Sequence, residues 1–302
     1  MTRRLAALDI GSNSTRLLVA DAERGRLEEV ERLLTITRLG DGVDASGRLA
    51  AEAMERVAAC VGRYAARARE LGAETPLAVA TSAVRDAANG EEFLARLERE
   101  HGVRTRLLAG EDEARLTLRG VASGRRLGAP VVVCDIGGGS TELIAGTAGD
   151  VRFAVSIDMG CVRLSERHLR DDPPTAEQLA AVRREVTELL PDDVPGGELI
   201  GVAGTITTLA TIDLGLEEEL PERVDGHRLG RETVEAELSR LAGLPLEQRR
   251  EVRGLMPQRA PTIVAGAAIL AQLMAELGAG SLSVSERDIL HGAALAAGDD
   301  TD

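Results

Sequence analysis

An internal repeat constrains the fold of this chain more than any other feature of its sequence. Residues 9–18 (DIGSNSTRLL) align without gaps to residues 135–144 (DIGGGSTELI), and six of the ten positions are identical. Each copy follows one apolar run and precedes another, which is the pattern of a strand, a tight turn and a second strand. We therefore expect one β-hairpin in each half of the chain, with an Asp at the end of its first strand.

The length and the order of the expected elements predict two α/β lobes. A chain of 302 residues is long for one compact core, and strand and helix patterns alternate in both halves. A stretch rich in Gly, Ser and Pro over 123–130 favours a boundary at Gly128. We expect domains at 1–127 and 128–302, and the last helix is a candidate for packing back on the first lobe.

Hydrophobic periodicity locates the other elements, and it favours a mostly parallel sheet with helical crossovers in the first half. Strands are expected at 33–39, 77–80, 104–108, 151–157 and 199–203. Helices are expected at 48–71, 91–100, 111–122, 176–190, 231–241, 261–277 and 287–297.

The two turns are candidate anion sites. Small residues let the backbone approach a ligand closely, and successive N–H groups of a turn form a nest for an anion. Two such hairpins facing each other across a cleft would grip a phosphate chain from both sides. The alternative is a pair of structural hairpins left by a duplication, with no bound anion.

Composition excludes several classes of protein. The chain has no Lys, which excludes a Walker P-loop and a Schiff-base mechanism. A net charge of −14 and 1% aromatic residues argue against a nucleic-acid partner. Three Cys without CxxC spacing favour reduced core residues over disulfides or zinc.

Targeting signals are not evident in the sequence. The first expected strand starts almost at once, without the apolar run of a signal peptide, and the apolar segment 263–277 is too short for a membrane span. We expect a cytoplasmic protein with no membrane partner.

Six motifs along most of the chain resemble the exopolyphosphatase and guanosine-pentaphosphate phosphatase family. In chain order they are Asp9–Arg16, Thr81–Arg85, Gly110–Ala114, Asp135–Glu142, Met159–Leu164 and Gly204–Thr208. The resemblance implies an α/β fold of two actin-like (ribonuclease H-like) lobes with a cleft between them.

The resemblance also implies roles for three carboxylates. Glu113 stands where the family has its proposed base, which takes a proton from the attacking water. Taken alone, it is an acidic residue favoured in the first turn of a helix. Asp135 and Glu142 flank the second turn, and two carboxylates beside a phosphate chain suit Mg²⁺. Their alternatives are a turn cap and a solvated strand residue.

Phosphate-binding residues are implied by the same motifs. Arg16 and Arg85 match positions that contact phosphate in the family, although either is also typical of a solvated surface. Further hydroxyl, amide and backbone donors are expected from Asn13, Ser14, Gly137, Gly138, Gly139, Ser140, Gly204 and Thr205.

These inferences predict an exopolyphosphatase that releases orthophosphate from inorganic polyphosphate, with Mg²⁺ and as a homodimer like its relatives. The charge of −14 repels a long polyanion and favours short chains. The alternatives are a pppGpp 5′-phosphatase, a kinase of the same superfamily and a non-catalytic sensor. The chain departs from the family at Ala203, Pro261 and Leu290, where a Gly, a polar residue and an Arg are common.

Overall fold

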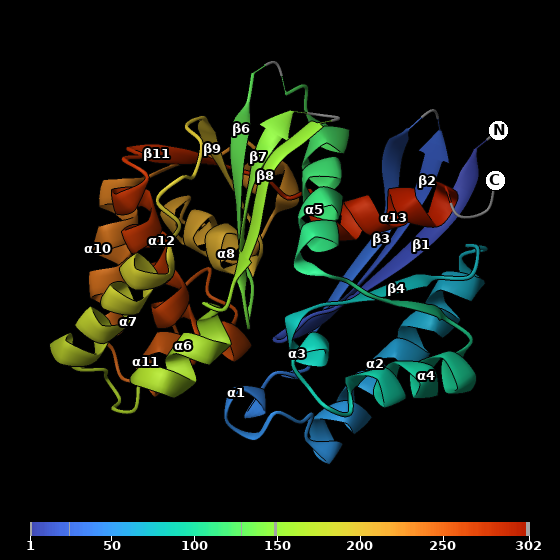
Figure 1. Cartoon of the computed structure of the whole chain (residues 1–302), viewed down its shortest axis with the longest axis horizontal. Coiled ribbons are helices and arrows are strands. Elements are labelled where there is room, and N and C mark those ends of the chain that lie inside the picture. The colour runs from blue at the N-terminus through green and yellow to red at the C-terminus, as the bar shows by residue number, and fades with distance from the viewer. Residues whose placement is uncertain (1, 24, 128, 148–149, 300–302) are drawn as a thin grey trace. The chain divides into compact units, whose positions relative to one another are not determined.

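The computed structural model describes residues 2–23, 25–127, 129–147 and 150–299 (Figure 1). The chain divides into two compact units, which are described separately here. Unit 1 comprises residues 1–127 and 287–302, and unit 2 comprises residues 128–286. The ranges expected from the sequence differ from these units in residues 287–302. Gly128, on which the expected boundary falls, lies outside the described residues.

Unit 1 is built on a five-stranded sheet of order β3-β2-β1-β4-β5. Its strands are β1 (Arg3–Ile10), β2 (Ser14–Glu23), β3 (Arg26–Ile36), β4 (Leu77–Ala80) and β5 (Arg104–Leu107). Its helices are α1 (Val43–Ser46), α2 (Ala51–Glu70), α3 (Ser82–Arg85), α4 (Gly90–His101), α5 (Gly110–Gly124) and α13 (Ile289–Asp299). The first predicted hairpin, β1–β2, is confirmed. The sheet is mixed rather than mostly parallel, because β1, β2 and β3 form an antiparallel meander.

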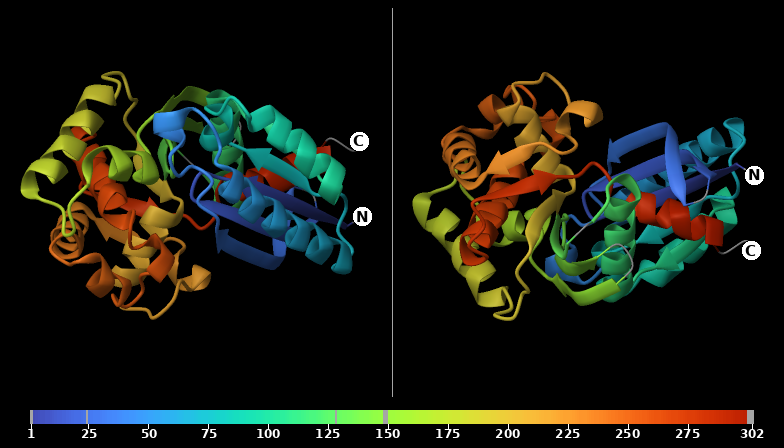
Figure 2. Two further views of the ribbon diagram at one scale, coloured as in Figure 1. Left: turned by 90° about the horizontal axis from the view of Figure 1, so that it is seen from below. Right: turned by 90° about the horizontal axis from the view of Figure 1, so that it is seen from above.

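Alternation along β1 gives the unit 1 sheet two apolar faces. Leu8 and Ile10 pack with residues of α2 and α4, whereas Ala7 packs with α13. Figures 1 and 2 show α2 and α4 along one face of this sheet and α13 along the other. Each large apolar side chain buried in this way contributes roughly 1.5–3 kcal/mol.

Two glycines explain why α13 belongs to unit 1. A Cβ on Gly120 of α5 would lie 1.8 Å from the carbonyl oxygen of Asp288, and a Cβ on Gly292 of α13 would lie 1.9 Å from that of Leu116. The two helices therefore approach more closely than any larger residue permits at these positions. This contact covers an apolar helix that a separate domain at 128–302 would have to bury elsewhere.

Unit 2 is built on a six-stranded sheet of order β10-β11-β9-β6-β7-β8. Its strands are β6 (Val131–Ile136), β7 (Thr141–Thr147), β8 (Asp150–Ile157), β9 (Glu198–Val202), β10 (Arg228–Gly230) and β11 (Ser281–Val284). Its helices are α6 (Cys161–His168), α7 (Ala176–Leu189), α8 (Gly204–Asp213), α9 (Pro221–Val224), α10 (Arg231–Ala242), α11 (Leu246–Arg250), the 3₁₀ helix η1 (Pro257–Arg259) and α12 (Ile263–Glu276). The second predicted hairpin, β6–β7, is also confirmed.

The two sheets repeat one plan, which gives the sequence repeat a structural meaning. In unit 1 the meander β1–β2–β3 is followed by the parallel strands β4 and β5. In unit 2 the meander β6–β7–β8 is followed by the parallel strands β9 and β11. Asp9 and Asp135 are the next-to-last residues of the first strands of their hairpins, close to the two repeated turns.

Within the described residues, no helix combines the length and the apolar character needed to cross a membrane. The apolar segment that was expected to form a buried helix is α12, and most of its residues are buried.

Candidate active site

The turn of the first hairpin is braced by the segment that follows β3. The N–H of Gly11 donates to the carbonyl of Ser14 (3.0 Å), which closes the turn. The carbonyl of Asn13 accepts hydrogen bonds from the N–H groups of Thr37 (3.0 Å) and Arg38 (2.9 Å). The predicted phosphate-binding residues Asn13 and Ser14 therefore stand on a turn with a fixed backbone.

Two side-chain contacts bring three of the sequence motifs together in unit 1. The hydroxyl of Ser12 lies 2.9 Å from that of Ser82, at the start of α3. At the end of α3, Arg85 donates from Nη1 to Glu113 Oε2 (3.1 Å) and to the carbonyl of Leu108 (3.1 Å). Glu113 lies in the first turn of α5 and is only 6% exposed. The predicted base and one predicted phosphate-binding Arg are thus in direct contact.

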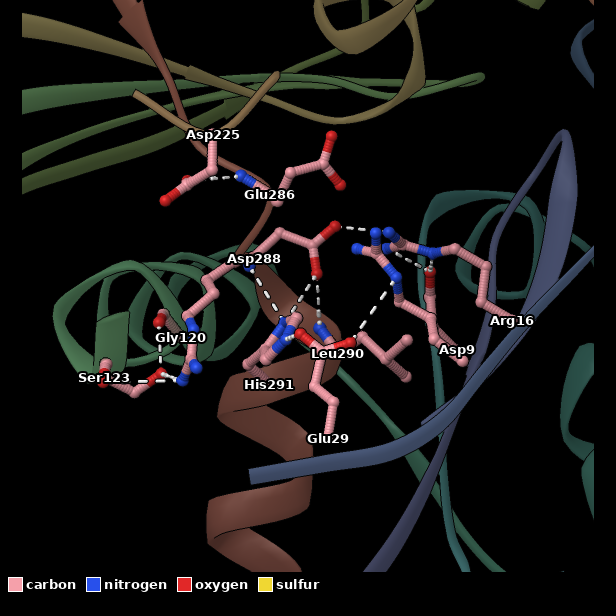
Figure 3. Close-up of polar contacts among 12 residues, drawn as sticks. Asp9, Arg16, Glu29, Gly120, Ser123, Asp225, Glu286, Asp288, Leu290 and His291 are labelled. Atoms are coloured by element: carbon pink, nitrogen blue, oxygen red, sulfur yellow. Dashed lines mark hydrogen bonds and ion pairs between the residues drawn. The ribbon is translucent and has the colours of Figure 1, made fainter. Parts of the chain in front are cut away.

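Arg16 is engaged by two carboxylates instead. It lies opposite Asp9 in the β1–β2 pair and donates from Nε (2.9 Å) and Nη2 (2.7 Å) to Asp9 Oδ2. Its Nη1 donates to Asp288, just before α13 (Figure 3). Sequence analysis missed Asp288, which is 272 positions away. The guanidinium has five N–H groups, so these three contacts leave two for a further acceptor.

Burial and ion pairing act against each other in this cluster. Burial alone would lower the pKa of Arg16, but Asp288 and Asp9 raise it above its ordinary value. Burial raises the pKa of Asp9 despite the nearby charge of Arg16. Burial also acts to raise the pKa of Asp288, yet Arg16 and His291 hold it well below the usual range. Arg16 therefore stays charged and keeps Asp288 ionised.

His291 extends the cluster to a second strand (Figure 3). Its side chain is fully buried, with Nε2 3.0 Å from Glu29 Oε1 of β3 and Nδ1 3.7 Å from Asp288 Oδ1. Burial would lower the pKa of His291, but the carboxylates of Asp288 and Glu29 raise it. These contacts of His291 thus hold α13 to the sheet of unit 1.

The raised pKa of His291 predicts a pH-dependent stability. Protonation of His291 is favoured in the folded state. Its contribution to the free energy of unfolding is therefore fully present below the ordinary pKa of about 6.5 and is lost as the pH rises through the higher pKa of the folded state. Replacing His291 with Gln should destabilise the protein by at least about 1 kcal/mol at pH 6, since hydrogen bonds to charged groups are lost. The difference in the free energy of unfolding between wild type and variant, measured in urea, should narrow as the pH rises above the ordinary pKa of about 6.5. A gap that stays constant over this range would contradict the assignment.

The equivalent pair in unit 2 consists of two acids. Asp135 lies directly opposite Glu142 in the β6–β7 pair, as Asp9 lies opposite Arg16 in unit 1. Both carboxylates are buried, and Ser156 donates from Oγ to Glu142 Oε1 (2.7 Å). Like charges at directly opposite positions destabilise a sheet. A cation bound at this position would therefore relieve the repulsion between the carboxylates of Asp135 and Glu142.

The oxygen donors of this pair fit Mg²⁺. This ion is usually held by one or two carboxylates together with waters and substrate phosphates. No group of three or more metal-binding side chains occurs in the part of the chain that the structure describes, so an all-protein cage is not formed there. Burial, and then the charges of Asp135 and Glu142, raise the pKa of the adjacent Cys134, which keeps its thiol protonated.

The turn of the second hairpin and the start of α8 hold the remaining predicted residues. The N–H of Gly137 donates to the carbonyl of Ser140 (3.0 Å), which repeats the closure of the first turn. Gly138 and Gly139 lie between them, and Gly204 and Thr205 form the first turn of α8. Sequence analysis did not predict α8, whose β-branched residues are nearly all buried and give no amphipathic pattern.

Cys161 and α12 contact these two parts of unit 2. The N–H of Cys161 donates to the carbonyl of Gly137 (2.9 Å), and its thiol is buried. A Cβ on Gly266 would lie only 2.5 Å from Thr205 Oγ1, so α12 packs tightly against this hydroxyl. The turn is therefore held by the backbone of Cys161, and the start of α8 is held by its close packing against α12.

Arg259 is a second residue that sequence analysis missed. It donates from Nη1 to the carbonyl of Gly204 (2.6 Å) and to Thr208 Oγ1 (2.7 Å), and it lies 3.6 Å from Glu219. Sequence analysis named only Pro261 in this part of the chain. The only signal in the sequence was an Arg two positions before Pro261, and its burial is seen only in the structure.

Comparison with known proteins gives the family of the chain. Residues 18–297 match the Ppx/GppA phosphatase family. The chain belongs to this family. It is 39% identical to exopolyphosphatase 2 of Mycobacterium tuberculosis, over 97% of this chain and 98% of the relative.

Solved structures of the Ppx/GppA family match the whole fold. An exopolyphosphatase-like protein shares 34% identity with a TM-score of 0.92, covering 99% of both chains. A family member from Aquifex aeolicus shares 31% identity with a TM-score of 0.82, covering 100% of this chain and 99% of the other. The predicted two-lobed α/β fold class is confirmed. The expected enzyme class, a hydrolase acting on phosphoric anhydrides, is confirmed as well.

One departure from the Ppx/GppA pattern has a visible backbone consequence. Ala203, between β9 and α8, has φ 72° and ψ 170°, a region that is essentially restricted to Gly. The backbone is therefore strained at Ala203, one of the three positions at which sequence analysis noted a departure from the family pattern.

Replacing Ala203 with Gly should raise the free energy of unfolding by about 1 kcal/mol. Relief of the backbone strain contributes about 1–3 kcal/mol, and the extra freedom of Gly in the unfolded chain offsets about 0.4–1 kcal/mol of it. Ala210→Gly, inside α8, is the matched control and should destabilise by about 1 kcal/mol. Urea unfolding of both variants measures this, and a loss of stability in Ala203→Gly would contradict it.

Proposed function

We propose that this chain is an exopolyphosphatase that hydrolyses the terminal phosphate of inorganic polyphosphate and releases orthophosphate. The observation that carries the proposal is the buried Glu113 carboxylate, held by Arg85 beside the Ser12 turn. A buried carboxylate with a fixed orientation is suited to act as a general base on water. The position of Glu113 in a family motif supports this role.

In the proposed reaction, Glu113 accepts a proton as the water oxygen bonds to the terminal phosphorus. The P–O bond to the rest of the chain breaks, and the shortened polyphosphate leaves with the negative charge. Within unit 1, Arg85 and the N–H groups of residues 12–14 would stabilise charge on phosphate oxygens, and within unit 2 the N–H groups of residues 138–140 would offer the same kind of contact. Asp135 and Glu142 would hold Mg²⁺, which supplies further neutralisation of phosphate charge when bound.

Arg16 contributes in a more limited way to this proposal. Its charge is compensated by Asp9 and Asp288, so it offers two directed N–H groups rather than a free positive charge. We infer that it orients a phosphate oxygen near the first turn.

Polyphosphate is favoured as the substrate because the Mycobacterium tuberculosis relative is an exopolyphosphatase. The net charge of −14 favours short chains, since a long polyanion is repelled more strongly. The homodimer and the cytoplasmic location that were inferred from the sequence stay predictions.

Phosphate release from tripolyphosphate, long-chain polyphosphate and pppGpp, measured side by side, tests this function. We expect tripolyphosphate to give the highest kcat/KM, and added salt should narrow its advantage over the long chain by screening. A clear preference for pppGpp would replace the proposed substrate with the nucleotide. A preference for the longest chains at low salt would contradict the charge argument.

A further inference from the structure

The start of α6 is directed at the glycine turn of the second hairpin. The N–H of Cys161 donates to the carbonyl of Gly137 (2.9 Å), and the N–H of Val162 donates to the carbonyl of Gly138 (2.8 Å). Backbone N–H groups in the first turn of a helix have no partner within the helix, so they are available for such contacts. Two successive carbonyls of the turn are therefore fixed by one helix end.

A side chain fixes the third carbonyl of the same turn. Arg163, also in the first turn of α6, donates from Nε to the carbonyl of Gly139 (2.7 Å). Its side chain is only 11% exposed and lies 3.8 Å from Asp158. The guanidinium is thus held against the backbone of the turn rather than extended into solvent.

The geometry of the peptide bond means that fixing these carbonyls also fixes the direction of the N–H groups that follow them. A trans peptide is planar, and its C=O and the following N–H point in opposite directions. Because the carbonyls of residues 137–139 face α6, the N–H groups of Gly138, Gly139 and Ser140 face away from it. Consecutive N–H groups on one side of a turn form an anion-binding nest.

The closeness of this packing is independent of charge. A Cβ on Gly160, just before α6, would lie 2.2 Å from the carbonyl oxygen of Gly138 and 2.4 Å from the nitrogen of Gly139. Any larger residue there would push the backbone of the turn out of place. The close packing of Gly160 therefore sets the shape of the turn, and the hydrogen bond from Arg163 orients its last peptide group.

We propose that Arg163 is a positioning residue for phosphate binding, which holds the Gly139–Ser140 peptide so that the N–H of Ser140 points at a phosphate oxygen. The proposal rests on the proposed function, because it assumes that this turn binds phosphate. It assigns Arg163 a role through the backbone of the turn and not a contact with the substrate. Lys at this position would present a point charge without the rigid donor geometry of the guanidinium.

Three variants separate this role from general effects of charge and stability. Arg163→Met removes the donor and keeps much of the apolar side chain. Gly160→Ala displaces the same turn without changing any charge. Arg167→Met is the matched control, because Arg167 lies in the same helix but pairs with Glu185 (2.5 Å).

The test compares calorimetric binding of tripolyphosphate with its rate of hydrolysis for wild type and all three variants. We expect Arg163→Met and Gly160→Ala to bind roughly ten- to a hundredfold more weakly, since small displacements of a positioning group have effects of this size. Arg167→Met should bind like wild type. Guanidinium added to Arg163→Ala should restore part of the binding, which a purely structural loss would not allow.

Equal binding by wild type and Arg163→Met would overturn the proposal, and so would equal losses in Arg163→Met and Arg167→Met. If Arg163→Met does not fold, Arg163→Lys and Gly160→Ala are used to test the proposal instead. Both should bind tripolyphosphate more weakly than wild type. Wild type that binds tripolyphosphate but does not hydrolyse it would overturn the proposed function while leaving the role of Arg163 testable through binding. Wild type that does not bind it would overturn the role of Arg163.

Discussion

Replacing Glu113 with Gln is expected to lower kcat for tripolyphosphate by roughly 10²–10⁴-fold, the range for removal of a general base. The amide oxygen of Gln can still accept the hydrogen bond from Arg85 that Glu113 Oε2 accepts at 3.1 Å. The site should therefore keep its shape while it loses the group that takes the proton from water. The expected change is in kcat, with substrate binding close to that of wild type.

Glu111→Gln is the matched control for this variant. Glu111 lies in the same first turn of α5, but its side chain is exposed and pairs only weakly with Arg115 (3.5 Å). It should retain the kcat of wild type. Thermal unfolding should show that both variants fold. Unchanged turnover in a folded Glu113→Gln protein would show that another group accepts the proton.

Removal of the divalent cation is expected to abolish activity, and added Mg²⁺ should restore it. Asp135 and Glu142 place two buried carboxylates directly opposite each other, and a bound cation would reduce the repulsion between them. Asp135→Asn should raise the Mg²⁺ concentration needed for half-maximal activity by roughly ten- to a hundredfold, the range found when the surroundings of a bound metal are altered. Glu142→Gln should act in the same direction.

Asp150→Asn provides the control for this series, because Asp150 is exposed at the start of β8 and pairs with Arg152 (3.0 Å). Its requirement for Mg²⁺ should match that of wild type. Activity titrated against Mg²⁺ in chelator-treated protein measures the effect. Full activity in excess chelator would contradict a role for the cation. An unchanged Mg²⁺ titration in Asp135→Asn would show that residues other than Asp135 bind the cation.

The sequence by itself determined the elements whose patterns are local. Alternating and helical periodicities placed β4 at Leu77–Ala80 and placed α2 and α4 to within a few residues. The repeat predicted both hairpins, because a strand, a turn of small residues and a second strand are encoded within about ten positions. Two other motifs, Thr81–Arg85 and Gly110–Ala114, singled out Arg85 and Glu113, which the structure brings into contact.

Tertiary structure alone decided the groups that share no local pattern. Asp288 meets Arg16 across 272 positions, and nothing in either segment indicates the other. The eight-residue α6 is too short to show a clear period, yet its first turn holds the carbonyls of the glycine turn. Hydrophobic periodicity reports which face of an element is buried, whereas the choice of partner depends on contacts between segments that only the folded chain brings together.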